Sequence, residues 1–165
     1  MSAVVSDTSP VRALAHLGLI DLLRTIYGQV LLPPAVHHEL TNPPARYAVV
    51  DVGPFPFIGV QSPRDQSAVQ HFLQTFQRGE SEAIALALEV QAKSLLIDEA
   101  KGRRIAKQVG LQPTGVLAVL VEGKQQGVVP AVGPLLDRLM NELNFFIAPS
   151  LRATVLLLAG EALTP

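Results

Sequence analysis

The 165-residue chain contains no cysteine, which excludes disulfide bonds, thiolate zinc sites and a cysteine nucleophile. Tryptophan is also absent, and charged residues make up only 16% of the chain. No apolar run reaches the roughly 18 residues that a membrane helix needs. The N-terminal segment MSAVVSDTSP has no basic region, so we expect no signal peptide. These absences together favour a cytoplasmic protein that makes no membrane contact.

Basic and acidic residues nearly balance, with 13 Lys and Arg against 14 Asp and Glu. A tight, sequence-independent nucleic-acid binder is usually more basic, so any such contact requires a local patch. Hydrophobic residues make up 48% of the chain, enough for a sizeable core and a surplus that suggests self-association. The length, without a convincing linker, predicts a single domain over residues 1–165, with residues from about 131 to 165 as a C-terminal helical extension.

Short apolar strands alternate with helices along the chain. Strands are expected at residues 3–5, 30–32, 57–60 and 94–97, with a candidate edge strand at 145–147. Helices are expected at residues 10–17, 19–27, 35–40, 65–76, 80–88, 99–109, 114–121, 134–143 and 151–159. This order is typical of βαβ units and predicts an α/β fold around a parallel sheet.

The segment GESEA at residues 79–83 is close to the G-x-S-x-G elbow of serine hydrolases. That elbow needs a strand directly before the serine, whereas residues 69–76 have the apolar spacing of a helix. A catalytic triad would also need a later histidine, but all four histidines precede Ser81. We therefore reject a serine hydrolase.

Two aspartates follow predicted strands: Asp7 comes after the first strand and Asp98 after the strand at 94–97. The carboxyl ends of parallel strands form the ligand crevice where strand order reverses, so these side chains can lie close together. Each could instead cap a turn or a helix. Glu39 stands near the C-terminal end of a short helix, where a negative charge is unfavourable unless a cation is nearby. An ordinary exposed glutamate remains the alternative for that position.

Glu80 and Glu82 lie in the first turn of the predicted helix after Gly79, where acids favour the helix dipole. Residues two apart on a helix point to nearly opposite sides, so at most one of them faces a given site. Carboxylates without cysteine suit Mg²⁺ or Mn²⁺, and such ions support phosphodiester hydrolysis. Scattered acids alone are nevertheless a weak signal.

Basic residues follow Asp98 on one predicted helix. They are Lys101, Arg103, Arg104 and Lys107. They could line a track for RNA phosphates, or they could form an ordinary solvated helix face.

Several segments, taken in order, resemble PIN-domain proteins. The segments are VVSDTS (4–9), PAVHHEL (34–40), GESEAI (79–84) and LLIDE (95–99), followed by Gly102-Arg103. The chain is most similar to a bacterial and archaeal branch described as nucleic-acid-binding and related to the toxin nucleases of toxin–antitoxin pairs. The similarity runs from residue 3 to about 130, and the stretch from Leu135 to Glu161 also looks like that branch.

The resemblance implies a Rossmann-like, three-layer α/β/α fold with a mostly parallel central sheet, and a ribonuclease that depends on Mg²⁺ or Mn²⁺. The implied catalytic and metal-binding acids are Asp7, Glu39, Glu82 and Asp98. At the third position the family pattern, an acid followed by Ala-Ile, fits Glu82 and not Glu80.

Supporting residues are also implied. Ser9 would hold the first aspartate, Thr114 would play a similar part, and Arg103 is the best candidate for an RNA phosphate contact. Glu99, where relatives often carry an aspartate, would bind metal weakly or merely favour the start of its helix.

The implied partners are RNA, a second copy of the chain in a homodimer, and an antitoxin protein. The main function hypothesis is an endoribonuclease. The alternatives are a non-catalytic PIN-fold module that binds RNA or protein, which the low charge favours, and a metal phosphohydrolase that acts on small phosphate esters.

Overall fold

The computed structural model describes residues 3–161, and its strands form one five-stranded sheet in which every pairing is parallel. The strands are β1 (Val4–Ser6), β2 (Val30–Leu32), β3 (Ile58–Val60), β4 (Ser94–Leu96) and β5 (Pro113–Thr114). Their order across the sheet is β3-β2-β1-β4-β5. The chain therefore moves one way from β1 to β3 and the other way from β4 to β5, which makes β1 and β4 the switch point of the sheet.

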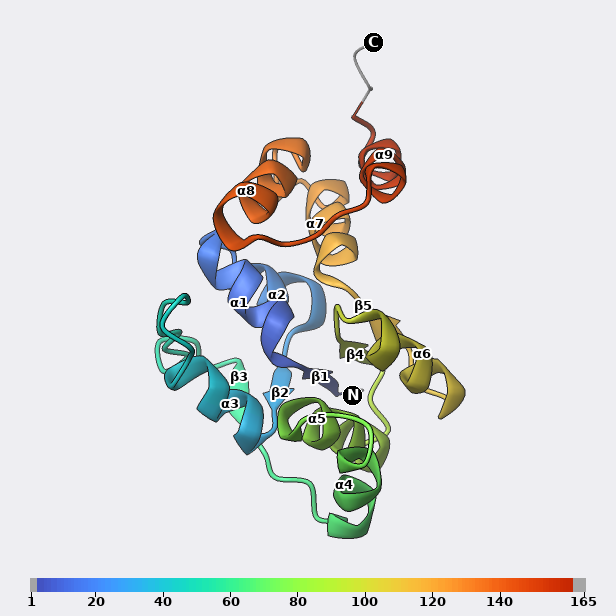
Figure 1. Ribbon diagram of the computed structural model, residues 1–165. Helices are drawn as coiled ribbons and strands as arrows, with labels where there is room; N and C mark the ends of the chain where they lie inside the picture. The colour runs from blue at the N-terminus through green and yellow to red at the C-terminus, as the bar shows by residue number, and fades with distance from the viewer. Residues whose placement is uncertain (1–2, 162–165) are drawn as a thin grey trace.

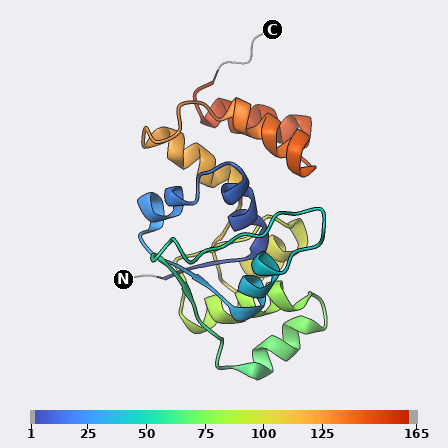
Figure 2. The same cartoon turned by 90° about the vertical axis from the view of Figure 1, so that its left-hand side faces the viewer.

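Helices connect the strands and cover both faces of the sheet (Figures 1 and 2). They are α1 (Thr8–His16), α2 (Asp21–Tyr27), α3 (Pro34–Thr41), α4 (Gln66–Leu73), α5 (Arg78–Glu89), α6 (Ala100–Gln108), α7 (Val116–Gln125), α8 (Gly133–Leu143) and α9 (Pro149–Leu158). Within residues 3–161, none of them is long and apolar enough to cross a membrane.

Alternation along the strands divides the apolar side chains between two cores. In β4, Leu96 points into one core, whereas Leu95 and the following Ile97 point into the other. In β1, Val4 and Val5 divide in the same way. This is the period of two expected for strands buried on both faces.

The first core takes side chains from α1, α2, α7, α8 and α9, and the second takes them from α4, α5 and α6. Figure 1 shows α7, α8 and α9 above the sheet and α4 and α5 below it. α3 joins the first core through Val36 and Leu40, and it also packs against α5. The predicted three-layer α/β/α architecture is confirmed, and the sheet is wholly parallel.

The predicted edge strand at 145–147 is wrong, because residues 144–148 have no regular secondary structure. Asn144 adopts the left-handed conformation, with φ of 52°, and Phe145 N–H donates to Leu139 O at 3.0 Å. That pattern closes a helix and turns the chain away. The apolar residues that suggested a strand instead divide, with Ile147 buried and Phe146 86% exposed.

Two further boundaries differ from the expectation. Thr114 belongs to the short β5, so the helix begins only at Val116. α5 begins at Arg78 with Gln77 as its N-cap, so Gly79 lies inside the first turn. The division into one domain with a helical extension from about residue 131 stays a prediction. α8 and α9 occupy that stretch, while residues 1–2 and 162–165 lie outside the described part.

Candidate metal centre

Asp7 follows β1 at the switch point, and its backbone N–H donates to Leu96 O at 2.8 Å, which fixes it beside the end of β4. Its side chain is 7% exposed, and although Asp7 is the N-cap of α1 it makes no side-chain capping hydrogen bond. Burial raises the pKa of Asp7 to about 7, against the opposing effect of the Thr8 backbone N–H. The negative charges of Glu80, Glu39 and Asp98 raise that pKa further, in decreasing order.

Asp98 follows β4, and donors from two other elements hold its carboxylate. Ser9 Oγ donates to Oδ2 at 2.8 Å, and Val116 N–H donates to Oδ1 at 2.7 Å. Burial raises the pKa of Asp98, whereas these two hydrogen bonds and the nearby charge of Arg103 lower it. Asp98 is therefore fixed in position as a carboxylate that can face the crevice.

Glu39 reaches the same place from α3, although it lies near the C-terminal end of that helix. Thr8 Oγ1 donates to Glu39 Oε2 at 2.5 Å. The start of α5 comes so close to this carboxylate that a Cβ at Gly79 would collide with Glu39 Oε1. The absence of a side chain at Gly79 lets the Glu39 carboxylate lie against α5, and a Cβ there would require this carboxylate to move.

Glu80, in the first turn of α5, is the acid that faces Asp7 and Glu39. Burial raises the pKa of Glu80 to about 7, a hydrogen bond with the Glu99 side chain and the charges of Glu99 and Glu39 raise it further, and the Gln77 backbone lowers it. Glu80 occupies the third position of α5, and its contact with the Gln77 backbone resembles a capping box.

The choice of Glu82 over Glu80 as a metal ligand stays a prediction, and the structure shows which partners the Glu82 carboxylate has. Glu82 is buried, but Ala35 N–H donates to its Oε1 at 3.2 Å and Arg78 donates to its Oε2 at 3.0 Å. Ala35 is the first residue after Pro33 and Pro34 that has an N–H, so Glu82 caps the start of α3 from another helix. The i,i+4 spacing of Arg78 and Glu82 was the sequence signal for this pairing.

The structure also shows the partners of the supporting residues. Ser9 was expected to hold the first aspartate, but its hydroxyl holds Asp98. The Thr114 hydroxyl pairs with Ser94 Oγ at 2.7 Å, and its expected supporting role stays a prediction. Thr8, which binds Glu39, was missed because a threonine after a strand-end aspartate has no distinctive spacing.

Glu99 favours the start of its helix, which is one of the two roles considered for it. Its side chain caps α6 by accepting from Lys101 N–H at 3.3 Å and Gly102 N–H at 3.1 Å. It nevertheless remains in contact with Glu80. The acids therefore form a chain of neighbours from Asp98 through Asp7 and Glu80 to Glu99, with Glu39 beside the middle two.

The donor set is chemically suited to Mg²⁺ or Mn²⁺, because every candidate ligand is a carboxylate and burial leaves their negative charge poorly compensated. Within residues 3–161, no three His, Asp or Glu side chains are already arranged as a metal-ion ligand group. The carboxylates are thus neighbours around a shared position rather than a closed cage.

Basic residues of α6 border one side of this site. Arg103 donates to Ile97 O at 3.2 Å, and its charge acts on Asp98. It also lines a cavity of about 480 Å³ that runs from Asp98 between α7 and α9. Lys101 lies over the Phe76 ring, with Nζ 5.7 Å from the ring centre, and Arg104 and Lys107 are exposed. A phosphate role for these four residues stays a prediction.

Comparison with known families agrees with this fold. The model of the family DUF3368, described as a PIN domain, matches residues 3–161. The chain therefore belongs to the PIN-domain family, whose members are generally nucleases. A search of curated proteins finds no significant match. Family membership supports interaction with nucleic acid, but it does not identify the substrate or the ion.

Proposed function

We propose that this PIN-domain protein is an endoribonuclease that depends on Mg²⁺ or Mn²⁺. Asp7, Glu39, Glu80 and Asp98 would hold the ion, and Glu82 would act as a positioning residue for α3. The observation that carries the proposal is the environment of Asp7, whose pKa rises to about 7 through burial and the charges of three other acids. A bound divalent cation would offset that unfavourable concentration of negative charge.

The chain's own residues would arrange the reacting groups. Ser9 and Val116 fix the orientation of Asp98, and Thr8 fixes that of Glu39. Without a bound ion, burial and neighbouring acids raise the pKa of Asp7 and of Glu80 to about 7, and a bound cation would favour the ionised form of both carboxylates. The ion, when bound, would supply charge neutralisation at the phosphate and a lower pKa for an attacking water.

The direct test is cleavage of a panel of labelled RNAs by the purified protein with Mn²⁺, with Mg²⁺ and with a chelator. We expect cleavage that needs the ion and is lost in Asp7→Asn. The proposal fails if no RNA in the panel is cleaved with either ion, or if Asp7→Asn cleaves as fast as the wild type. A parallel panel of nucleotides and phosphate esters tests for a small-substrate phosphohydrolase, which would cleave these and leave RNA intact.

A non-catalytic module that binds RNA or protein is the second candidate. The observations that favour it are the net charge of −1 and the lack of a ready-made ligand group among residues 3–161. Isothermal titration with Mn²⁺ separates the two candidates. The nuclease requires saturable binding that Asp7→Asn and Glu80→Gln both weaken, whereas the module requires none.

We also propose a homodimer and, for a toxin-type nuclease, an antitoxin partner. Support comes from apolar side chains exposed on and near α9, where Leu157 is 76% and Leu158 60% exposed. Light scattering after size exclusion tests the dimer, and a monomer at micromolar concentration would refute it. Co-expression with the product of an adjacent small gene tests the antitoxin, which should co-purify and suppress cleavage.

A further inference from the structure

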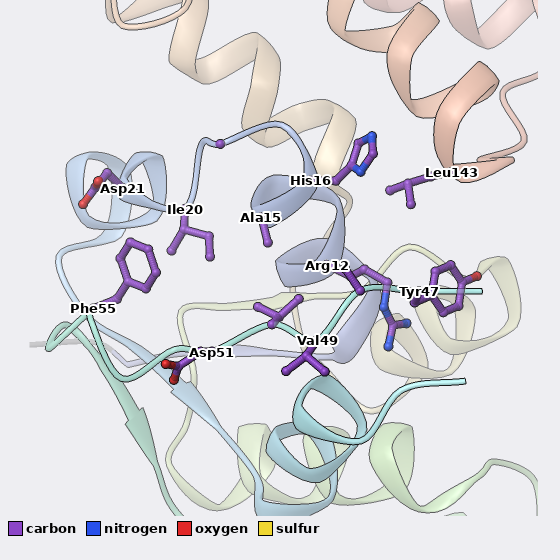
Figure 3. A pocket seen from close by; sticks show the side chains of 13 residues that line it. Arg12, Ala15, His16, Ile20, Asp21, Tyr47, Val49, Asp51, Phe55 and Leu143 are labelled. Atoms are coloured by element: carbon purple, nitrogen blue, oxygen red, sulfur yellow. The ribbon is translucent and has the colours of Figure 1, made fainter. Parts of the chain in front are cut away.

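A second cavity, of about 350 Å³, lies beside the acids on the side opposite α6, between α1, the start of α2 and the loop around residues 47–55 (Figure 3). Its volume is within the range of small-molecule sites, about 300–1,000 Å³. Figure 3 shows Arg12 and Tyr47 at one end and Phe55 with Asp21 at the other. The cavity therefore has a cationic, aromatic end and a mainly apolar body.

The cationic end is formed by Arg12, which lines the cavity, whereas Arg46, which does not line it, lies near the ring of the same Tyr47. Arg12 Cζ lies 4.2 Å and Arg46 Cζ 4.9 Å from the centre of the Tyr47 ring. Each charge lowers the stability of the other, and the charge of Arg46 contributes to lowering the pKa of Arg12, after the larger effect of burial. Two like charges held this close favour an anion between or beside them.

Neither guanidinium is neutralised by a salt bridge within residues 3–161, although four other arginines of that range have one. Arg12 makes one long hydrogen bond, from Nη2 to Glu39 O at 3.4 Å, and its Nε is buried without a hydrogen-bond partner. A buried, unpaired donor on a charged group is costly, so Arg12 is held at the cavity at a cost in stability.

Arg12 also connects the cavity to the acidic site. The carbonyl it contacts belongs to Glu39, and the charges of Glu39 and Asp7 both act on its guanidinium. The acids at the other end of the cavity are already engaged, because Asp51 Oδ1 accepts from Gly53 N–H at 2.9 Å and Asp21 lies 3.8 Å from Arg24. An anion would therefore be drawn to the Arg12 end, next to the carboxylates.

We propose that this cavity binds one nucleotide of a single-stranded RNA substrate, with its phosphate at Arg12 and Arg46 and its base against the apolar body formed with Val49 and Phe55. This inference rests on the proposed function. The inference adds the path of the bound RNA to the proposed function, because the RNA strand would run from α6 across the acids to Tyr47. An unstacked base in a pocket is the usual mode of single-strand RNA recognition.

Binding can be measured without cleavage. The full chain carrying Asp7→Asn is titrated against a fluorescent single-stranded RNA in a chelator, alone and with Arg46→Ala, Tyr47→Ala or Tyr47→Phe added. Arg46 is exposed, so its substitution leaves the fold intact, and thermal unfolding checks this. Arg64→Ala is the matched control, since it removes the same charge from an exposed site on the loop before α4.

We expect Arg46→Ala and Tyr47→Ala to weaken RNA binding about tenfold, Tyr47→Phe to restore it, and Arg64→Ala to change it less than about twofold. The slope of log affinity against log salt should fall by about 0.7 for Arg46→Ala, the value for one lost phosphate contact on a single strand. A nucleoside monophosphate should compete with RNA in the parent protein. Equal binding by Arg46→Ala, Tyr47→Ala and Arg64→Ala overturns the proposal, as does binding of the mononucleotide without binding of RNA.

Failure of this inference and failure of the nuclease proposal are distinguishable. If the wild-type background cleaves RNA with Mn²⁺, the same variants should raise KM with little change in kcat. If the variants cleave RNA with an unchanged KM, the proposal for the cavity is wrong and the nuclease proposal stands. If RNA binding depends on Tyr47 and Arg46 but no RNA is cleaved, the proposal for the cavity stands and the nuclease proposal is wrong.

Discussion

The β1–α1 and β4–α6 junctions place aspartates at equivalent points of neighbouring parallel strands, yet they treat them differently. Asp98 accepts hydrogen bonds from Ser9 and Val116 and has the charge of Arg103 beside it. Asp7 is surrounded mainly by other acids. The position at the sheet's switch point is shared, so the elements packed over each junction decide how much a negative charge costs there. Asp98 is held by donors of the protein itself, whereas burial and the charges of three other acids oppose the negative charge of Asp7.

The largest expected difference between the two junctions appears when each aspartate is replaced by asparagine. We expect Asp7→Asn to lower metal-dependent RNA cleavage by about 100-fold or more. The same change should stabilise the metal-free protein at pH 8 by roughly 1–3 kcal/mol, because it removes a buried, unfavourable charge. Asp98→Asn should also lower cleavage, but it should destabilise the protein by about 1–2 kcal/mol because one of its hydrogen bonds loses an acceptor.

Kinetics with Mn²⁺ and urea unfolding with a chelator measure these effects. Asp137→Asn, which alters an exposed ion pair with Arg152, is the control for loss of one negative charge. Destabilisation by both Asp7→Asn and Asp98→Asn would show that the two junctions are equivalent after all.

The stabilising effect of Asp7→Asn should depend on pH in a defined direction. Because the pKa of Asp7 is raised from 3.8 to about 7 in the folded state, the folded protein binds more protons than the unfolded chain between these values. Wild-type stability is therefore lost as the pH rises through this window. The difference in unfolding free energy between Asp7→Asn and wild type should be near zero at about pH 4 and reach its full value, roughly 1–3 kcal/mol, above pH 7.

Urea unfolding at several pH values measures this difference, and Mn²⁺ at pH 8 should abolish most of it by stabilising the wild type selectively. A difference that is constant from pH 4 to pH 8 would contradict the raised pKa. A larger difference at low pH would contradict its sign.

Glu80 and Glu82 give a second pair of neighbouring acids with unlike surroundings. We expect Glu80→Gln to weaken Mn²⁺ binding about tenfold and, because the pKa of Glu80 is also raised to about 7, to stabilise the metal-free protein slightly above pH 7. Glu82→Gln should leave Mn²⁺ binding within about twofold, but it should cost about 1 kcal/mol of stability because Ala35 and Arg78 lose a charged acceptor. Calorimetric Mn²⁺ titration and urea unfolding of both variants provide the measurement. Weaker Mn²⁺ binding in Glu82→Gln alone would support the choice of Glu82 made from the sequence and contradict the assignment of Glu80.

The sequence was sufficient for the parallel α/β fold because strands and helices differ strongly in apolar spacing. It also placed Asp7 and Asp98 correctly, since residues that follow parallel strands must meet at one edge of the sheet. Helix spacing alone could not choose between Glu80 and Glu82, and the choice of Glu82, which stays a prediction, came from the resemblance. A shift of the N-cap from Gly79 to Gln77 changes the role of both residues.

Contacts between distant segments were also beyond reach of sequence patterns. The closeness of Gly79 to Glu39 depends on how α5 packs against α3, forty residues earlier in the chain. Likewise, Arg12 and Arg46 meet on Tyr47 only because the loop after α3 folds back over α1. Nothing in the local spacing of these residues indicates such an approach.

The smallest expected effect concerns Ser9, which lies between the two junctions in sequence and serves only one of them. Ser9→Ala should cost about 1 kcal/mol or less and lower cleavage about threefold, because Asp98 keeps its bond from Val116 N–H. A double-mutant cycle then assigns its partner. The interaction free energy between Ser9→Ala and Asp98→Asn should be about 0.5–1 kcal/mol, and that between Ser9→Ala and Asp7→Asn should be near zero. The reverse pattern would mean that Ser9 supports the first aspartate, and that the contrast between the two junctions has been drawn the wrong way round.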